Sequence, residues 1–165
     1  LDTVRACVQG VDVVFHQAAL ASVPRSVVDP VASNEVNVSG TLNVLWAAKA
    51  ARVRRVVYAA SSSVYGDTEI LPKQEGMPAN PQSPYAASKA AADQLALSYY
   101  RSFELPVTVV RPFNTYGPRQ SARAVIPTII TQILAGNEKI RLGSLFPTRD
   151  LTFVKDTVRG FLAEG

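Results

Sequence analysis

The sequence lacks the features that mark secreted, membrane-spanning and nucleic-acid-binding proteins. Its single cysteine, Cys7, excludes a disulfide within the chain, so we expect a reducing, cytoplasmic setting. No apolar run reaches about 18 residues, and the N-terminus lacks the layout of a signal peptide. The basic residues form one cluster, at 51–55, without the interleaved aromatic residues of a nucleic-acid module. We therefore expect neither a membrane nor a nucleic acid as partner, and the sequence indicates no metal site.

The composition is that of an ordinary globular domain. The 165 residues are 47% hydrophobic and 18% charged, which is enough chain for one domain with a sizeable core. The net charge of +4 suits an anionic substrate such as a nucleotide diphosphate. The chain begins without Met and ends in FLAEG, inside a helical pattern, so we expect a fragment of a longer protein.

Strand-like and helix-like segments alternate along the chain. Short apolar runs predict buried strands at 11–19, 54–62 and 106–113, with further short strands at 139–142 and 151–154. Helical patterns cover 31–51, 83–103 and 124–136, the last with Gly136 as a C-cap, and a final helix starts near Lys155. The helix at 31–51 rests on the spacing of Val36, Leu42, Leu45 and Trp46. Apolar strands alternating with helices predict an α/β fold with a parallel sheet covered on both faces.

Polar residues follow each of the three main strands. His16 and Gln17 follow the first, Ser61–Ser63 the second, and Arg111–Asn114 the third. Ligands of such sheets bind beyond the carboxyl ends of the strands, so we expect a site at this edge. His16 is the only histidine, and we expect it to be structural or next to a cofactor, not an acid or base.

The stretch SPYAASK at 83–89 places Tyr85 and Lys89 on one face of a helix, four positions apart. A nearby cation lowers the pKa of a tyrosine from about 10, which brings the phenol closer to the working range of a general base. The pattern alone is common, so its context matters. Ser61 ends a buried strand earlier in the chain, and its hydroxyl either binds a substrate oxygen beside the phenol or only caps a turn.

Five motifs in order, FHQAA, NVSGTLNVLWAA, VVYAASSSVYGD, SPYAASK and RPFNTYGPRQ, resemble the extended short-chain dehydrogenase/reductase family. Within that family they are similar to NAD-dependent nucleotide-sugar epimerases and dehydratases, along nearly the whole chain. The resemblance implies a Rossmann-like, doubly wound parallel sheet and NAD as the cofactor. It also implies a nucleotide-sugar substrate, a role in carbohydrate biosynthesis, and a parent enzyme that is a homodimer.

The same resemblance assigns roles to individual residues. Tyr85 matches the catalytic base, Lys89 its partner that also holds the nicotinamide ribose, and Ser61 the catalytic Ser/Thr. Cofactor contacts fall on His16, Gln17, Ala18, Ala19, Asn37, Tyr85, Lys89 and Pro112. Substrate contacts fall on Ser62, Ser63, Asn114, Val125 and Arg149.

The chain departs from the family pattern at both ends. The Gly-rich phosphate loop, G-x-x-G-x-x-G, is absent, and the C-terminal substrate lobe stops soon after Arg149. The resemblance therefore implies that residues 1–119 form a partial NAD-binding Rossmann domain with the catalytic residues. Residues 120–165 are expected to start the substrate-binding lobe, interleaved with the sheet. We expect the isolated chain to be inactive.

Two reactions fit the motifs, and both begin with a phenolate taking the proton of a sugar C4 hydroxyl, through a transient 4-keto intermediate. Dehydratases of the family carry an acid/base pair where this chain has Ser62 and Ser63, so a 4-epimerase of the UDP-N-acetylhexosamine type is predicted. The later stretch, from RPFNTYGPRQ to PTRDLTFV, resembles UDP-sugar 4,6-dehydratases, which remain the alternative. A truncated, non-catalytic nucleotide-binding module is the alternative of another class.

Overall fold

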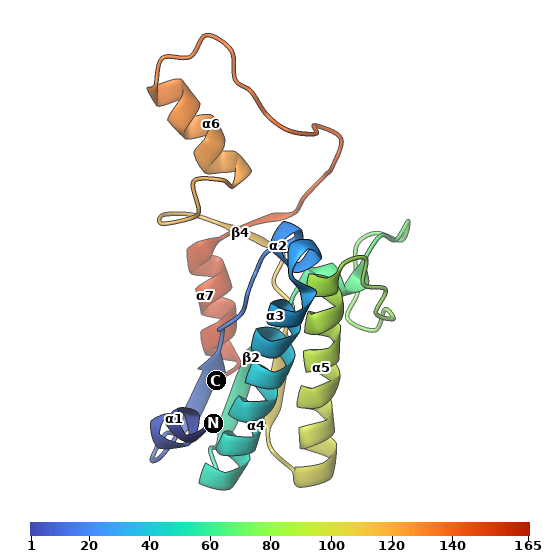
Figure 1. Cartoon of the computed structure of the whole chain (residues 1–165), viewed down its shortest axis with the longest axis vertical. Helices are drawn as coiled ribbons and strands as arrows, with labels where there is room; N and C mark the ends of the chain where they lie inside the picture. Colours follow the sequence, from blue (N-terminus) through green and yellow to red (C-terminus); the bar gives the residue numbers. More distant parts are fainter. The chain divides into compact units, whose positions relative to one another are not determined.

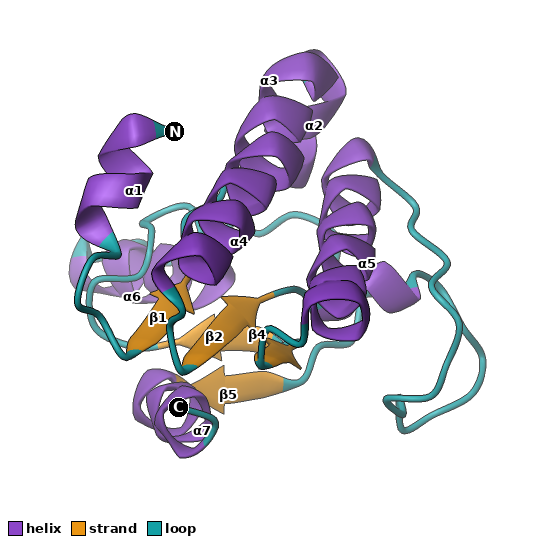
Figure 2. Ribbon diagram, turned by 90° about the horizontal axis from the view of Figure 1, so that it is seen from below, coloured by secondary structure: helices purple, strands orange, loops and turns teal.

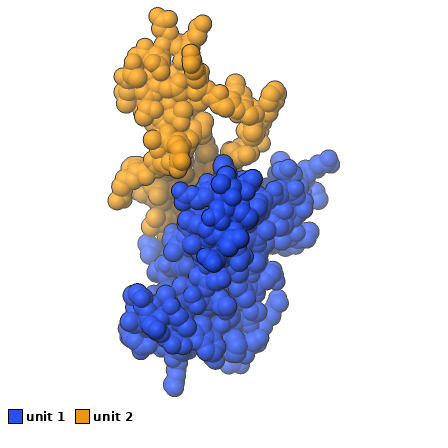
Figure 3. Space-filling view, viewed as in Figure 1, with its two compact units in different colours: residues 1–112, 161–165 blue, residues 113–160 orange.

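The structure, a computed structural model, describes all 165 residues and divides into two compact units (Figure 3). Unit 1 comprises Leu1–Pro112 and Phe161–Gly165, and unit 2 comprises Phe113–Gly160. The cofactor and substrate roles predicted for residues 1–119 and 120–165 concern function and remain predictions.

Unit 1 is built on a parallel sheet, as the apolar strands predicted. Strands β1 (Val13–His16), β2 (Arg55–Ala59) and β3 (Val107–Val110) pair in the order β1-β2-β3. The central strand β2 buries Val56, Val57 and Tyr58 completely, because it has a neighbour on each side. The predicted parallel α/β architecture is confirmed.

Helices α1 (Asp2–Cys7), α4 (Gly40–Ala51) and α5 (Pro84–Phe103) cover one face of this sheet (Figure 2). Their small and apolar residues, among them Leu45, Ala92 and Ala96, form the core between these helices and the sheet. Helices α4 and α5 lie side by side (Figure 1). The short helices α1 and α2 (Val23–Val28) and the 3₁₀ turn η2 (Ser62–Tyr65) were not predicted from the sequence.

The helix predicted at 31–51 is interrupted by a wider turn. Helix α3 (Pro30–Asn34) runs into the π-helical turn η1 (Glu35–Ser39), which leads into α4. A π turn is wider than an α-helical turn, with hydrogen bonds between residues five apart. Of the four residues whose spacing predicted this helix only Leu45 is buried, and Val36, Leu42 and Trp46 are exposed. The polar residues Asn37 and Thr41 point inward instead.

Unit 2 contains a parallel strand pair, one complete helix and most of a second helix. Strands β4 (Asn114–Tyr116) and β5 (Leu151–Phe153) pair, α6 spans Val125–Leu134, and α7 spans Val154–Ala163, its last residues belonging to unit 1. The strand predicted at 151–154 and the helix predicted at 124–136 are confirmed, and Gly136 follows the helix with φ 74°.

The strand predicted at 139–142 is wrong. The side-chain amide of Gln132 accepts a bond from the N–H of Arg141 at 2.8 Å and donates one to its carbonyl at 2.9 Å. A single side chain thus satisfies the backbone groups that a neighbouring strand would pair with. None of the helices combines the length and the hydropathy that crossing a lipid bilayer requires.

Candidate active site

The parallel register brings the predicted strand-end residues of unit 1 to one edge of the sheet. His16, the last residue of β1, pairs with Tyr58, so β1 ends one residue before the end of β2. Beyond β2, the N–H of Ser62 donates to the carbonyl of Pro112 at 3.2 Å. His16, the serine turn and Pro112 are therefore neighbours along this edge, as the strand pattern predicted.

Helix α5 presents Tyr85 and Lys89 from its first turns. Ser83 caps the helix by accepting from the N–H of Ala86, and Pro84 occupies its first turn. Tyr85 is half-buried, and its N–H donates to the Ser26 hydroxyl at 3.0 Å, which attaches the start of α5 to α2. The predicted helix at 83–103 is confirmed.

Lys89 is a buried cation, with only 3% of its surface exposed. Its ammonium donates to the carbonyl of Ala59, the last residue of β2, at 2.8 Å, and lies 5.0 Å from the centre of the Tyr58 ring. Burial lowers the pKa of Lys89 to about 8, and the negative charge of Asp93 opposes that shift. Two of the three ammonium donors remain for other acceptors.

Ser61 caps the turn that follows β2. Its hydroxyl oxygen accepts from the N–H of Ser63 at 3.2 Å and from the Ser63 hydroxyl at 2.8 Å. Ser61 therefore caps this turn, and its binding of a substrate oxygen remains a prediction. Because both bonds use lone pairs, the proton of the Ser61 hydroxyl is still free to be donated. Gly66 closes the turn at φ 59°, a conformation that favours glycine.

His16 is neutral and held in one orientation. The Thr41 hydroxyl donates to the carbonyl of Asn37 at 2.7 Å, so its oxygen must accept from His16 Nε2, 2.9 Å away. Burial, and next the charge of Lys89, lower the pKa of His16 to about 4. A neutral imidazole fixed in this way fits the structural or cofactor-adjacent role that the sequence suggested.

Asn37, in the π turn η1, forms side-chain hydrogen bonds with the segment after β1 and with helix α5. Its side-chain oxygen accepts from the N–H of Leu20 at 2.8 Å, and its Nδ2 donates to the Ser88 hydroxyl at 2.9 Å. Ser88 in turn donates to the carbonyl of Tyr85 at 2.8 Å. The completely buried Asn37 thereby holds both the segment after β1 and the first turn of α5.

Sequence reasoning missed a second charged group beside Lys89. Asp93, with 1% of its surface exposed, accepts from Nε of Arg111 at 2.9 Å. Arg111 follows β3 and also donates to the Tyr65 hydroxyl at 3.0 Å. The available signal was the position of Asp93, one helical turn after Lys89 on α5.

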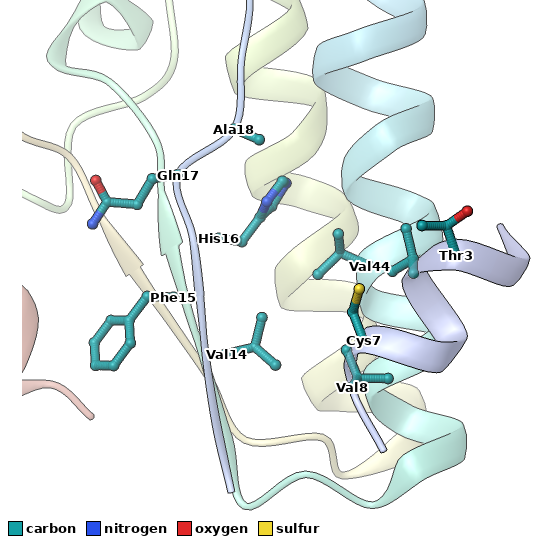
Figure 4. A pocket seen from close by; sticks show the side chains of 10 residues that line it. Thr3, Cys7, Val8, Val14, Phe15, His16, Gln17, Ala18 and Val44 are labelled. Carbon is teal, nitrogen blue, oxygen red and sulfur yellow. The ribbon is translucent and has the colours of Figure 1, made fainter. Parts of the chain in front are cut away.

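A cavity of about 250 Å³ opens beside β1, between α1 and α4. His16 and Ala18 line it together with apolar residues, and Figure 4 shows Cys7 and Val44 on the side opposite β1. Gln17 and Phe15 project away from these two residues in the same view (Figure 4). The cavity therefore lies against the segment to which cofactor contacts were assigned.

The residues of this edge fit part of a dinucleotide. Gln17 and Ala18 are exposed after β1, and the free donors of the Lys89 ammonium match the hydroxyl groups of a ribose. For the pyrophosphate, the chain has no G-x-x-G-x-x-G loop, the usual cradle of backbone N–H groups. The residues at this edge therefore suit a ribose of the cofactor, and the chain carries no such loop for its pyrophosphate.

Three predicted substrate contacts lie in unit 2. Asn114 is the exposed first residue of β4, and Val125 is the half-exposed first residue of α6. Arg149 is exposed, and its guanidinium donates to the carbonyl of Thr148 at 2.7 Å. All three therefore present groups at the surface of their unit.

The sequence is similar to known nucleotide-sugar enzymes. The chain is 41% identical over 158 residues to a UDP-glucose 4-epimerase of Mycolicibacterium smegmatis, a match that covers 93% of this chain and 50% of that protein. It is 38% identical over 153 residues to the human dTDP-D-glucose 4,6-dehydratase, covering 92% of this chain and 43% of that protein. The chain thus spans about half the length of the relatives it matches.

The fold also matches that of a solved nucleotide-sugar epimerase. The UDP-N-acetylglucosamine 4-epimerase of Methanobrevibacter ruminantium, in complex with UDP-N-acetylmuramic acid, superposes with a TM-score of 0.93 at 35% identity. The match covers 98% of this chain and 53% of that one. The model of the NAD-dependent epimerase/dehydratase family matches residues 1–163. The chain therefore belongs to the NAD-dependent epimerase/dehydratase family, whose members include UDP-sugar 4-epimerases and dTDP-glucose 4,6-dehydratases.

Proposed function

We propose that this chain is the catalytic core of an NAD-dependent nucleotide-sugar 4-epimerase of the UDP-N-acetylhexosamine type. The observation that carries the proposal is the serine turn after β2, in which Ser62 and Ser63 stand beside Ser61 without a carboxylate. The whole protein is proposed to include the remaining half that the relatives have, and to pair with a second copy of itself.

Each catalytic group has a defined task in this proposal. Tyr85 takes the proton of the sugar C4 hydroxyl as general base, and Lys89 lies one helical turn further along α5. The Ser61 hydroxyl donates to the C4 oxygen, because its lone pairs are occupied by Ser63. The chemistry that NAD supplies when bound is the reversible acceptance of a hydride from C4.

The supporting residues keep these groups in place. Asn37 and Ser26 hold the first turn of α5 through bonds to Ser88 and to the Tyr85 N–H. We propose cofactor contacts for His16, Gln17, Ala18, Ala19, Asn37, Tyr85, Lys89 and Pro112. We propose substrate contacts for Ser62, Ser63, Asn114, Val125 and Arg149.

Elimination across C5–C6 is disfavoured by the chemistry of the turn. That reaction needs one group to remove the C5 proton and another to protonate the departing C6 hydroxyl. Serine hydroxyls do not change charge near neutral pH, so Ser62 and Ser63 are poor at both tasks. An epimerase needs neither group; it needs space in which the keto sugar can turn over.

The second candidate is a 4,6-dehydratase. It is favoured by the similarity of the later stretch of the chain to such enzymes, and by a solved dTDP-glucose 4,6-dehydratase of Streptomyces venezuelae with NAD bound. That structure matches this chain with a TM-score of 0.91 at 35% identity. A non-catalytic nucleotide-binding module is the remaining candidate.

Product analysis separates the three candidates. The full-length protein is incubated with UDP-N-acetylglucosamine and NAD⁺, and the products are followed by NMR. Inversion at C4 of the hexose is the expected result. A new methyl doublet at C6 would assign the dehydratase reaction, and unchanged substrate together with measurable binding would assign the non-catalytic module.

A further inference from the structure

The mechanism proposed above leaves one buried acid unused. Asp93 lies on α5 one turn after Lys89, with 1% of its side chain exposed. Its Oδ2 is bound by Arg111, whereas its Oδ1 is buried without a hydrogen-bond partner. A buried carboxylate oxygen without a partner is costly, so a structural pair alone leaves it unexplained.

Charged and titratable groups face Lys89 from three elements. From α5 itself come Asp93 and, one turn earlier, Tyr85; from β2 comes the Tyr58 ring; and from β1 comes the neutral His16. Arg111, beyond β3, adds a second cation next to Asp93. Asp93 is thus the single carboxylate in a cluster of two cations, at the edge where Tyr85 lies.

Lys89 and Asp93 have separate direct partners. The Lys89 ammonium binds the carbonyl of Ala59, and the Asp93 carboxylate binds Arg111. Their coupling is therefore between charges at a distance of one helical turn, inside a region where screening by water is weak. Arg111 is anchored in addition by the Tyr65 hydroxyl, so it fixes the position of the carboxylate.

We infer that Asp93 is a positioning residue that acts through Lys89: its fixed negative charge keeps the buried ammonium protonated at neutral pH. This inference rests on the proposed role of Lys89 beside Tyr85. A carboxylate that served only to join α5 to the end of β3 would hold Arg111 without affecting the proton of Lys89.

The test measures the Lys89 proton directly. The full-length protein is labelled with ¹³C,¹⁵N-lysine, the Lys89 signal is assigned from its loss in Lys89→Arg, and its pKa is obtained by NMR titration. In Asp93→Asn, which keeps an oxygen for Arg111 but removes the charge, we expect the pKa of Lys89 to fall by about one unit. Glu104→Gln is the matched control, because it removes an exposed carboxylate just beyond the far end of α5 and should leave the titration unchanged.

A second variant keeps the inference testable if Asp93→Asn does not fold. In Asp93→Ser the carboxylate charge is removed in a smaller side chain, so the pKa of Lys89 should fall as in Asp93→Asn. An unchanged Lys89 titration in either folded Asp93 variant overturns the inference. The titration needs no turnover, so it is read independently of the product analysis that tests the proposed function.

Discussion

At the scale of single residues, the half-buried Tyr85 and the buried Lys89 are proposed to do different work. In the full-length enzyme, Tyr85→Phe should lower kcat by about 10²–10⁴-fold, the usual contribution of a general base, with substrate binding nearly unchanged. Lys89→Met should reduce both kcat and the affinity for NAD, since the ammonium is proposed to serve both. Steady-state kinetics and cofactor titration measure these effects.

The control for Tyr85 is Tyr100→Phe, because Tyr100 is an exposed tyrosine on the same helix. It should leave kcat unchanged. Small and equal losses from Tyr85→Phe and Lys89→Met would show that the pair is structural.

His16 gives the stability of the protein a predictable pH dependence. The folded state holds the pKa of His16 at about 4, below its ordinary 6.5, because the ring is buried. Between these values the unfolded chain binds a proton that the folded protein does not, so stability is full above about pH 6.5 and is lost as the pH falls toward 4. From pH 7.5 to 5.0 the expected loss is about 2 kcal/mol.

Urea unfolding of the wild type and of His16→Gln at the two pH values isolates this effect. Glutamine keeps an amide donor toward Thr41 but does not titrate, so the variant should lose about 2 kcal/mol less stability on acidification. The same pH dependence in both proteins would mean that His16 titrates normally in the folded state.

At the scale of elements, the π turn η1 carries Asn37, whose side chain connects the segment after β1 with helix α5. Asn37 is buried there and bonds both Leu20, after β1, and Ser88 on α5. Asn37→Ala should lower the free energy of unfolding by about 1–3 kcal/mol, because it leaves buried partners without bonds.

Asn34→Ala is the matched control for Asn37, since Asn34 is exposed on the preceding helix and its side chain makes no capping bond. Its effect should stay within about 0.5 kcal/mol. Urea unfolding measures both variants, and equal effects would contradict a special role for the π turn.

At the scale of the whole molecule, the 165-residue chain is proposed to contact only part of the cofactor. We expect it to bind NAD weakly, because it has no Gly-rich loop to provide backbone N–H groups for the pyrophosphate. Isothermal titration calorimetry of the isolated chain measures this, with the full-length protein as the control. A micromolar Kd for the isolated chain, equivalent to about −8 kcal/mol, would contradict the expectation.

The sequence by itself determined the features that depend on local patterns. Apolar runs between helical segments predicted the parallel sheet, because buried strands and helices differ in period and length. The spacing of Tyr85 and Lys89 predicted a shared helix face, and the polar residues after the strands predicted one common edge. Each of these follows from neighbouring residues and the geometry of one element.

Only the tertiary structure decided the features that depend on distant partners. Asn37 and Thr41 lie on the inward face with Leu45, four residues apart, while the apolar Val36, Leu42 and Trp46 stay exposed. Which face turns inward depends on the segments that the helix packs against. The strand predicted at 139–142 does not form, because the Gln132 amide occupies the backbone of Arg141. From the sequence alone, Asp93 resembles an ordinary acidic residue on a helix surface. In the folded protein it is buried and paired with Arg111, which follows β3. Burial and charge at such sites arise from packing between segments far apart in the chain, and local sequence does not encode them.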